Sequence, residues 1–202
     1  DQLLFGTVIS LGKQDQPHLP NHYRPVVILG TVYRAWSRMN ALPLLQVLGS
    51  VVPAAAHGFL PGRECAQIWL QLQCFIEVCL QQGIELSGFS TDIEKCFNNV
   101  GRDSLMALAS HVGFSPQLLQ PWRSFLDTFL RSFQVKTALS EAVLSSQGLP
   151  EGCSMSVVGM VLIDWAFHVY HSALAPSVHA FSYVDNVSEA GHKVMDVVSA
   201  FF

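Results

Sequence analysis

The sequence has few charges and no long uninterrupted apolar run. Only 13% of its 202 residues are charged and 50% are hydrophobic, with a mean hydropathy of +0.34. This composition excludes a disordered chain. Residues 155–175 and 68–80 come closest to a membrane span. Polar side chains interrupt both, and neither reaches the roughly 18 to 20 apolar residues that a bilayer requires. We therefore predict two buried core helices and no membrane partner.

The sequence also lacks cysteine pairs at metal-binding spacing. Its five cysteines include no C-x-x-C, which favours a reduced intracellular compartment, nuclear or cytoplasmic. His18 and His22 are separated by Pro20, which breaks any helix that would align them. His168 and His171 can share a helix face, although such a pair is more often structural or on the surface than a metal site.

A basic excess is missing as well. The chain carries 11 Lys and Arg against 15 Asp and Glu, a net charge of −4. Proteins that bind nucleic acid usually have the opposite balance, since neutralising phosphates drives much of their affinity. The chain begins at Asp1 without a signal pattern and ends in an apolar run. We expect a piece of a longer polypeptide, whose other parts carry the missing charge.

Periodicity and turn residues predict a mixture of strands and helices without regular β-α alternation, which indicates an α+β fold. The predicted strands are residues 8–11, 24–29, 84–93 and a strand or hairpin at 132–144. One predicted helix starts at Thr31. The other predicted helices cover residues 64–82, 102–112, 116–131 and 154–173. A final hairpin over 178–187 is predicted to have Asp185 and Asn186 at its tip, because Asp and Asn tolerate positive φ.

Two aspartates occupy positions where metal-dependent phosphoryl transfer would need them. Asp92 ends a predicted strand, and Asp185 lies in the final hairpin. Divalent ions activate a hydroxyl and neutralise the leaving pyrophosphate, and Mg²⁺ takes few carboxylates besides water and phosphate oxygens. Two carboxylates at neighbouring strand ends repel each other unless a cation lies between them. Each aspartate taken alone is more often a turn or capping residue.

Five sequence blocks, in order, resemble those of LINE-type (non-LTR) retrotransposon reverse transcriptases. They are LGK to HYRPV at residues 11–26, HGFLPGR at 57–63, TDIEKCFNNV at 91–100, GLPEGCSMS at 148–156 and YVDN at 183–186. The third resembles motif A of this family (D-x-x-K-A-F-D-x-V), the fourth motif B (G-x-x-Q-G-x-x-L-S) and the fifth motif C (Y-x-D-D). No single block is decisive, but the ordered set is specific.

The resemblance implies roles at matching positions. Asp92 and Asp185 would bind two Mg²⁺ (or Mn²⁺) ions, with the Ile93 carbonyl as a backbone ligand and Asn186 as a further catalytic position. The implied nucleotide-binding residues are Lys13, Arg24, Phe97, Glu151 and Gly152. The implied template and primer residues are Arg63, Ser156 and Tyr183.

Some of these roles leave alternatives open. Phe97 falls where an aromatic ring excludes the ribose 2′-hydroxyl, although it is also an ordinary type of core residue. Lys13 is equally consistent with a solvated surface residue. Arg63 would face either a template phosphate or a structural carboxylate.

The implied architecture is that of right-hand polymerase fingers and palm, with an antiparallel palm sheet flanked by helices and with no thumb. We expect fingers over residues 1–85, palm with motif A over 86–115, a fingers/palm connection over 116–147 and palm with motifs B and C over 148–202. The implied activity is RNA-directed DNA polymerisation. The implied partners are an RNA template, a DNA primer, dNTPs and the rest of the parent polyprotein, including a thumb and an endonuclease domain.

The sequence departs from the family pattern at two further points. Asn186 replaces the second aspartate of motif C, and Glu151 replaces the usual glutamine of motif B. Loss of one unit charge near a divalent ion weakens metal binding. Two alternatives therefore remain: a catalytically inactive domain that only binds nucleic acid or protein, and another palm polymerase such as a telomerase-like or viral enzyme.

Overall fold

The computed structural model describes residues 5–13 and 23–201. The loop predicted between the first two strands, with His18 and His22, lies outside the described residues. The chain divides into two compact units. Unit 1 comprises residues 1–42 and 97–159, and unit 2 comprises residues 43–96 and 160–202. These boundaries differ from the four predicted segments, whose assignment to fingers and palm stays a prediction.

Unit 1 is built on a mixed sheet with strand order β2-β1-β4-β5, and β6 pairs with β4. Strands β1 (Phe5–Gly12) and β2 (Tyr23–Leu29) are antiparallel, and β1 runs parallel to β4 (Leu130–Val135). The predicted strand or hairpin at 132–144 is a hairpin, because the chain turns at Lys136, where φ is 53°, into β5 (Ala138–Leu139) and β6 (Val143–Leu144).

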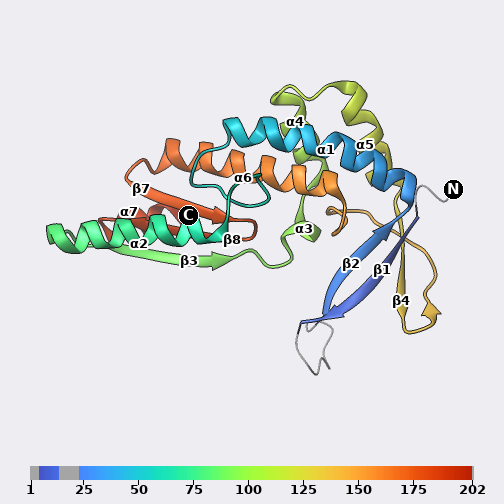
Figure 1. Cartoon of the computed structure of the whole chain (residues 1–202), viewed down its shortest axis with the longest axis horizontal. Helices are drawn as coiled ribbons and strands as arrows, with labels where there is room; N and C mark the ends of the chain where they lie inside the picture. The colour runs from blue at the N-terminus through green and yellow to red at the C-terminus, as the bar shows by residue number, and fades with distance from the viewer. Residues whose placement is uncertain (1–4, 14–22, 202) are drawn as a thin grey trace. The chain divides into compact units, whose positions relative to one another are not determined.

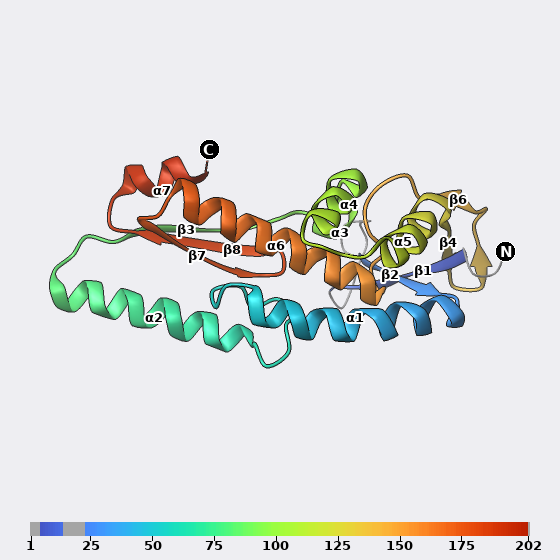
Figure 2. The same ribbon diagram turned by 90° about the horizontal axis from the view of Figure 1, so that it is seen from above.

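The helices of unit 1 include the short α3 (Cys96–Asn99), α4 (Arg102–His111) and α5 (Pro116–Thr128), and α4 packs against α5 (Figure 2). Helix α5 ends three residues earlier than predicted because Phe129 has an extended backbone and Leu130 already belongs to β4. The core of this unit is formed by fully buried side chains, among them Val8, Leu105, Trp122, Leu126 and Phe129.

Unit 2 contains a three-stranded antiparallel sheet with strand order β3-β8-β7 (Figure 1). The strands are β3 (Ser87–Asp92), β7 (Val178–Tyr183) and β8 (Asn186–Gly191). Helix α2 (Cys65–Gln82) packs on β7, and α7 (Val194–Phe201) packs on all three strands. The predicted α+β class and the predicted antiparallel sheet flanked by helices are confirmed; α3 and α7 were not predicted.

Helix α2 begins and ends where the sequence predicts. Glu64 and Gln67 form a reciprocal capping box at its N-terminus, and Gly83 closes it with a left-handed backbone at φ 63°. Its predicted burial is wrong. Only Ile68 and Cys79 are buried, whereas Trp69 is 67% exposed. The apolar content of this helix is therefore spread around its circumference instead of being directed into a core.

Two long helices run from one unit into the other along the chain, α1 (Thr31–Val51) and α6 (Ser154–Leu174). Helix α6 is the one described helix that is long and apolar enough to cross a membrane, a property that core helices share. Met155, Val158 and Leu162 on it are fully buried, as expected for a core helix. All five cysteines carry free thiols.

Candidate active site

The candidate active site of unit 2 lies at one end of its antiparallel sheet. Asp92, the last residue of β3, is the register partner of Asn186, the first residue of β8. Directly opposed residues of an antiparallel pair project from the same face with Cα atoms only about 5 Å apart. Just beyond this pair, the amide of Ile93 donates to the carbonyl of Asp185 at 2.8 Å. The structure therefore brings together all four residues that the sequence analysis assigned to catalysis and metal binding.

The turn that carries Asp185 is shifted by one residue from its prediction. Val184 and Asp185 form the two-residue loop, and Asn186 already pairs with Tyr183. Val184 has a φ of 61°, which is rare for a β-branched residue and costs on the order of 1–3 kcal/mol. The strain puts Asp185 at the sheet end with its carboxylate next to the amide of Asn186, whose Nδ2 donates to Asp185 Oδ1 at 3.1 Å.

A neighbouring segment, residues 55–58, supports this turn from the side of β7. The amide of Ser182 donates to the Ala55 carbonyl at 3.1 Å, and the amide of His57 donates to the Ser182 carbonyl at 3.0 Å. Gly58 then passes so close to the turn that a Cβ on it would lie 2.6 Å from the backbone nitrogen of Val184. Only glycine allows this approach, which gives the second sequence block a structural reason for its glycine.

The electrostatics of this site favour a cation. Neither Asp92 nor Asp185 forms an ion pair with any basic group in the described part of the chain. Unit 2 carries three basic residues against nine acidic ones, a net charge of −6. No group of three or more His, Cys, Asp and Glu side chains is arranged around a metal position among residues 5–13 and 23–201. The available donors are instead two carboxylates, an amide oxygen and backbone carbonyls, which is the all-oxygen set that Mg²⁺ prefers.

Behind the turn, a buried polar network joins α6 to β7. His168 Nε2 lies 2.7 Å from Ser182 Oγ and 3.8 Å from Asp164 Oδ1. Burial raises the pKa of Asp164 to about 6, against the opposing effects of a hydrogen bond with Ser182 and the charge of Arg63. Burial lowers the pKa of His168 to about 4, in the same direction as the charges of His171 and His57. Near neutral pH, His168 is therefore uncharged.

The second histidine of the predicted pair is also buried. His171 Nε2 lies 3.5 Å from Glu189 Oε2 on β8, with both side chains no more than 5% exposed. The pair thus connects α6 to both strands of the hairpin, His168 to β7 and His171 to β8. These contacts fit the structural alternative for the pair rather than a metal site, because each histidine faces a side chain of the protein.

Arg63 has partners other than the two that the sequence left open. Its Nη atoms donate to four backbone carbonyls, those of Gly49, Val52, Pro53 and Ala56, at 2.5 to 2.9 Å. Its guanidinium therefore binds backbone carbonyls and not a carboxylate or a template phosphate. The template/primer role assigned to Arg63 is replaced by a structural role. Two of these carbonyls, those of Gly49 and Val52, lie at the end of α1, where a helix leaves its last carbonyls without partners, and the other two lie in the segment that follows.

Unit 1 brings together most of the predicted nucleotide-binding residues. Lys13 follows β1 and Arg24 lies near the start of β2, and both side chains are exposed at the same end of this hairpin. Burial raises the pKa of Glu151, while a hydrogen bond from Asn98 Nδ2 at 3.0 Å and the nearby charges of Arg24, Arg131 and Lys13 act in the opposite direction. The charges of three basic side chains of unit 1 thus act on Glu151.

The motif B loop is attached to β2 and to the end of motif A. The amide of Val27 donates to the Glu151 carbonyl at 2.7 Å, and a Cβ on Gly152 would lie 2.8 Å from the Val27 carbonyl oxygen. The amide of Leu149 donates to the carbonyl of Phe97 at 2.7 Å. Phe97 is half-buried beside this loop on α3, and Gly152 has a φ of 105° that favours glycine.

Ser156, which the resemblance assigns to template and primer as a residue that shapes the motif B loop, lies inside the fold. Its side chain is fully buried, with 0% exposure, and its hydroxyl has no hydrogen-bond partner in the part of the chain that the structure describes. A buried side chain is compatible with shaping this loop, and the role of Ser156 toward template and primer stays a prediction. Tyr183, the other residue assigned to this role, is half-buried at the end of β7 and precedes the strained turn. Its role in primer contact stays a prediction.

The described geometry therefore contains two sets of candidate residues. The carboxylate end of the sheet belongs to unit 2, and the group of Lys13, Arg24, Phe97, Glu151 and Gly152 belongs to unit 1. The sequence analysis gave no role to the residues that support the turn of unit 2, above all Ser182 and, within the second sequence block, Gly58. A buried serine and a loop glycine carry no local signal of this role.

A family model described as "Reverse transcriptase (RNA-dependent DNA polymerase)" matches residues 11–189. The chain is 23% identical over 146 residues to the "Transposon TX1 uncharacterized 149 kDa protein" of Xenopus laevis, covering 72% of this chain and 11% of that protein. It thus spans about a tenth of the curated relative's length. Together these matches confirm the resemblance to a retrotransposon reverse transcriptase.

Solved structures of similar fold include two yeast telomerases. Apo telomerase from Candida tropicalis, truncated from its C-terminal domain, has a TM-score of 0.72 at 9% identity, covering 99% of this chain and 46% of that chain. Telomerase from Candida albicans, in complex with a TWJ fragment of telomeric RNA, has a TM-score of 0.64 at 12% identity, covering 98% and 39%. At these identities the likeness concerns the fold, and it confirms the predicted polymerase fingers-and-palm class.

Proposed function

Because the chain belongs to the reverse transcriptase (RNA-dependent DNA polymerase) family, we propose that it extends a DNA primer along an RNA template with dNTPs by two-metal-ion nucleotidyl transfer. The observation that carries the proposal is the register of β3 against β8, which pairs Asp92 with Asn186 and puts Asp185 in the adjoining turn. Mg²⁺ or Mn²⁺ would be held by Asp92 and Asp185, with the Ile93 carbonyl and the Asn186 amide oxygen as further donors.

The divalent ions, when bound, lower the pKa of the primer hydroxyl and neutralise the charge of the leaving pyrophosphate. The protein's part is to hold the oxygen donors in place without reorganisation. The strained turn at Val184 and the close approach of Gly58 fix the position of the Asp185 backbone. Asp92 is fixed independently, since it ends a paired strand.

Lys13 and Arg24 would bind the triphosphate of the incoming nucleotide. Both are exposed cations at one end of the β1–β2 hairpin, and Arg offers a bidentate fork to phosphate. The charges of Lys13 and Arg24 act on Glu151, which would attract their side chains in the absence of nucleotide. Phe97 would exclude the 2′-hydroxyl, so the nucleotide substrate would be a deoxynucleotide.

Asn186 favours a second candidate function, that of a catalytically inactive reverse transcriptase-like domain that only binds nucleic acid or protein. An asparagine in place of the second aspartate of motif C offers a carbonyl oxygen but no negative charge. The two candidates differ in one property, which is the incorporation of nucleotides under control of Asp92 and Asp185. The parent protein is proposed to supply a thumb and an endonuclease, and to work in the nucleus or cytoplasm.

Primer extension separates these candidates. The chain is incubated with oligo-dT on poly-rA and labelled dTTP, with Mg²⁺ or Mn²⁺, beside the variants Asp92→Ala and Glu85→Ala. Glu85 is an exposed acid of the same unit that lies outside all five sequence blocks. We expect incorporation by the wild type and Glu85→Ala, and a loss of at least about 100-fold in Asp92→Ala. Equal, background-level incorporation by all three proteins would leave only the inactive alternative.

A further inference from the structure

The end of motif A and the motif B loop are joined by main-chain hydrogen bonds within unit 1. The amide of Gly148 donates to the Val100 carbonyl at 3.1 Å, and the amide of Leu149 donates to the Phe97 carbonyl at 2.7 Å. A Cβ on Gly148 would lie 2.5 Å from the carbonyl oxygen of Asn98, so the two segments touch at their backbones. The backbone alone therefore fixes how these two segments are aligned.

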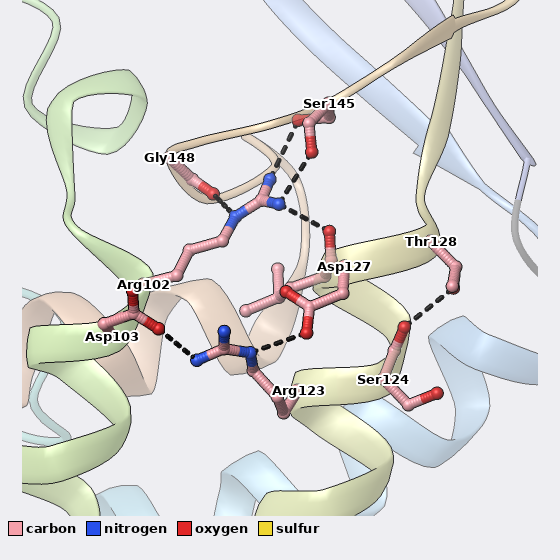
Figure 3. A network of polar contacts seen from close by, with 9 residues as sticks. Arg102, Asp103, Arg123, Ser124, Asp127, Thr128, Ser145 and Gly148 are labelled. Atoms are coloured by element: carbon pink, nitrogen blue, oxygen red, sulfur yellow. Dashed lines mark hydrogen bonds and ion pairs between the residues drawn. The ribbon is translucent and has the colours of Figure 1, made fainter.

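A buried arginine holds the segment that leads into the motif B loop. Arg102, which is 7% exposed, donates through Nε to the Gly148 carbonyl at 2.8 Å. Its Nη1 donates to the carbonyls of Leu126 and Ser145 at 2.5 and 2.6 Å. Its Nη2 donates to Ser145 Oγ and to the Gln147 carbonyl at 2.9 and 3.1 Å (Figure 3). The side chains that follow this segment therefore start from a firmly held backbone.

A side-chain hydrogen bond spans the two segments as well. Asn98 Nδ2 donates to Glu151 Oε1 at 3.0 Å, and both residues are half-buried. An amide and a carboxylate are complementary, because the amide supplies the N–H donor that an ionised carboxylate lacks. Two carboxylates at this distance would repel each other unless they shared a proton. The pair therefore accommodates one acid but not two.

The same two positions depart from the family pattern together. Motif A of the family, D-x-x-K-A-F-D-x-V, has an aspartate where this chain has Asn98, and motif B has a glutamine where it has Glu151. The acid and the amide have thus changed places. The exchange keeps one carboxylate and one amide at the two positions, whereas either replacement alone would leave two amides or two acids.

The exchange moves the negative charge onto the loop that approaches β2. The Glu151 carbonyl accepts a hydrogen bond from the amide of Val27, three residues after Arg24. Burial raises the pKa of the Glu151 carboxyl, whereas its hydrogen bond and the charges of Arg24, Arg131 and Lys13 act in the opposite direction. Unit 1 carries eight basic and six acidic residues, a net charge of +2. An acid at this place is therefore favoured by the charges around it.

We propose that Asn98 and Glu151 are an exchanged acid–amide pair, in which Asn98 is a positioning residue that holds the Glu151 carboxylate as an internal counter-anion of the basic residues of unit 1. The inference rests on the proposed function in one respect, which is that Lys13 and Arg24 receive the nucleotide triphosphate. A carboxylate whose charge acts on these cations competes with an incoming triphosphate, because like charges repel. Glu151 thus weakens nucleotide binding, and Asn98 keeps it in the position from which it does so.

A double-mutant cycle on the full 202-residue chain tests the pairing without requiring synthesis. Urea unfolding is followed by circular dichroism near neutral pH for the wild type, both single variants and the double variant. Asn98→Asp should lower the urea midpoint by about 1 M, because it puts two carboxylates at hydrogen-bond distance. Adding Glu151→Gln to it should restore the midpoint to within about 0.3 M of the wild type. Glu151→Gln alone should lower it by less than about 0.5 M, because two amides still form a hydrogen bond.

Two further variants and a second pH separate charge repulsion from a general effect of substitution. Asn98→Ala removes the donor and adds no charge, so its smaller loss should persist when Glu151→Gln is added. Gln120→Glu adds an acid at an exposed amide of the same unit and should shift the midpoint by less than about 0.3 M. The loss in Asn98→Asp should shrink by at least about half near pH 5, where the two carboxylates share a proton. A double variant no more stable than Asn98→Asp, or a loss that is independent of pH, would overturn the pairing.

Equilibrium dialysis with labelled dTTP and Mg²⁺ tests the counter-anion. Glu151→Gln should bind dTTP about threefold more tightly than the wild type, because one like charge is removed. Glu141→Gln, at an exposed acid of the same unit, is the matched control and should change the affinity less than about 1.5-fold. Equal or weaker binding by Glu151→Gln would refute the counter-anion. If none of the proteins bound dTTP, the counter-anion would fail together with the proposed nucleotide site, whereas rescue in the unfolding cycle would still establish the pair.

Discussion

The buried pair Asp164 and His168 gives a quantitative prediction about stability and pH. In the folded protein the pKa of Asp164 is raised from 3.8 to about 6, and that of His168 is lowered from 6.5 to about 4. Each shift of about two units corresponds to about 3 kcal/mol of stability at 1.36 kcal/mol per unit. Both side chains are nearly buried, at 12% and 6% exposure, so solvent screens these energies little.

The two shifts have opposite signs. The folded state binds the proton of Asp164 more tightly than the unfolded state does, so this group adds stability as pH falls from about 6 to 3.8. The folded state binds the proton of His168 less tightly, so this group removes stability as pH falls from 6.5 to about 4. In the wild type the two contributions nearly cancel between about pH 4 and 6.

Replacing either residue makes the contribution of the other to the pH dependence of stability measurable. Relative to the wild type, Asp164→Asn should lose about 3 kcal/mol of unfolding free energy between pH 6.5 and 4, and His168→Gln should gain about the same over this range. The assay is urea unfolding followed by circular dichroism at pH 4, 5, 6 and 7, with each variant compared with the wild type at each pH. Because other carboxylates titrate alike in all three proteins, they cancel in the differences. Parallel curves for the three proteins would refute the reasoning.

Three other substitutions test the site. Asn186→Asp should raise nucleotide incorporation or lower the Mg²⁺ requirement about tenfold or more, because it adds a charge next to Asp92; an unchanged metal titration would put position 186 outside the metal shell. Arg63→Met should lower the unfolding free energy by roughly 2–4 kcal/mol in urea titrations, since four carbonyls lose their donor; a loss below 0.5 kcal/mol would contradict the structural role. Gly58→Ala should cost about 1–3 kcal/mol and shift the amide NMR resonance of Val184, whereas an unshifted resonance would mean that the close approach is absent in solution.

Much of the site was predictable because its residues come in ordered blocks. The positions of Asp92 and Asp185 were predicted from where a strand and a hairpin end, and the β3–β8 register pairs Asp92 with Asn186, the residue after Asp185. The predicted turn was misplaced by one residue because Asn tolerates positive φ and Asn186 was therefore expected in the turn. The residue that has positive φ is Val184, a residue type that adopts it only when the neighbouring backbone constrains it. Constraint of this kind depends on the packing of Gly58, 126 positions before Val184 along the chain, and leaves no mark in the sequence near the turn.

Other features escaped the sequence because their causes are tertiary. The partners of Arg63 are backbone carbonyls, which carry no side-chain signature. Helix α2 was expected in the core from its apolar content, but that content does not say on which side the sheet lies. The net charge of −4 concealed a positive unit and a negative unit, since the units are interleaved along the chain and average out in any count.

The central claim is that Asp92 and Asp185 together hold the divalent ions at one shared site. Binding of Mn²⁺ to the chain, followed by the loss of the free-ion electron paramagnetic resonance signal, tests this without requiring synthesis. Asp92→Asn and Asp185→Asn should each weaken Mn²⁺ binding about tenfold or more, while Glu85→Gln, at an exposed acid of the same unit, should change it less than about twofold. Wild-type affinity in both aspartate variants, or an equal loss in Glu85→Gln, would contradict the claim.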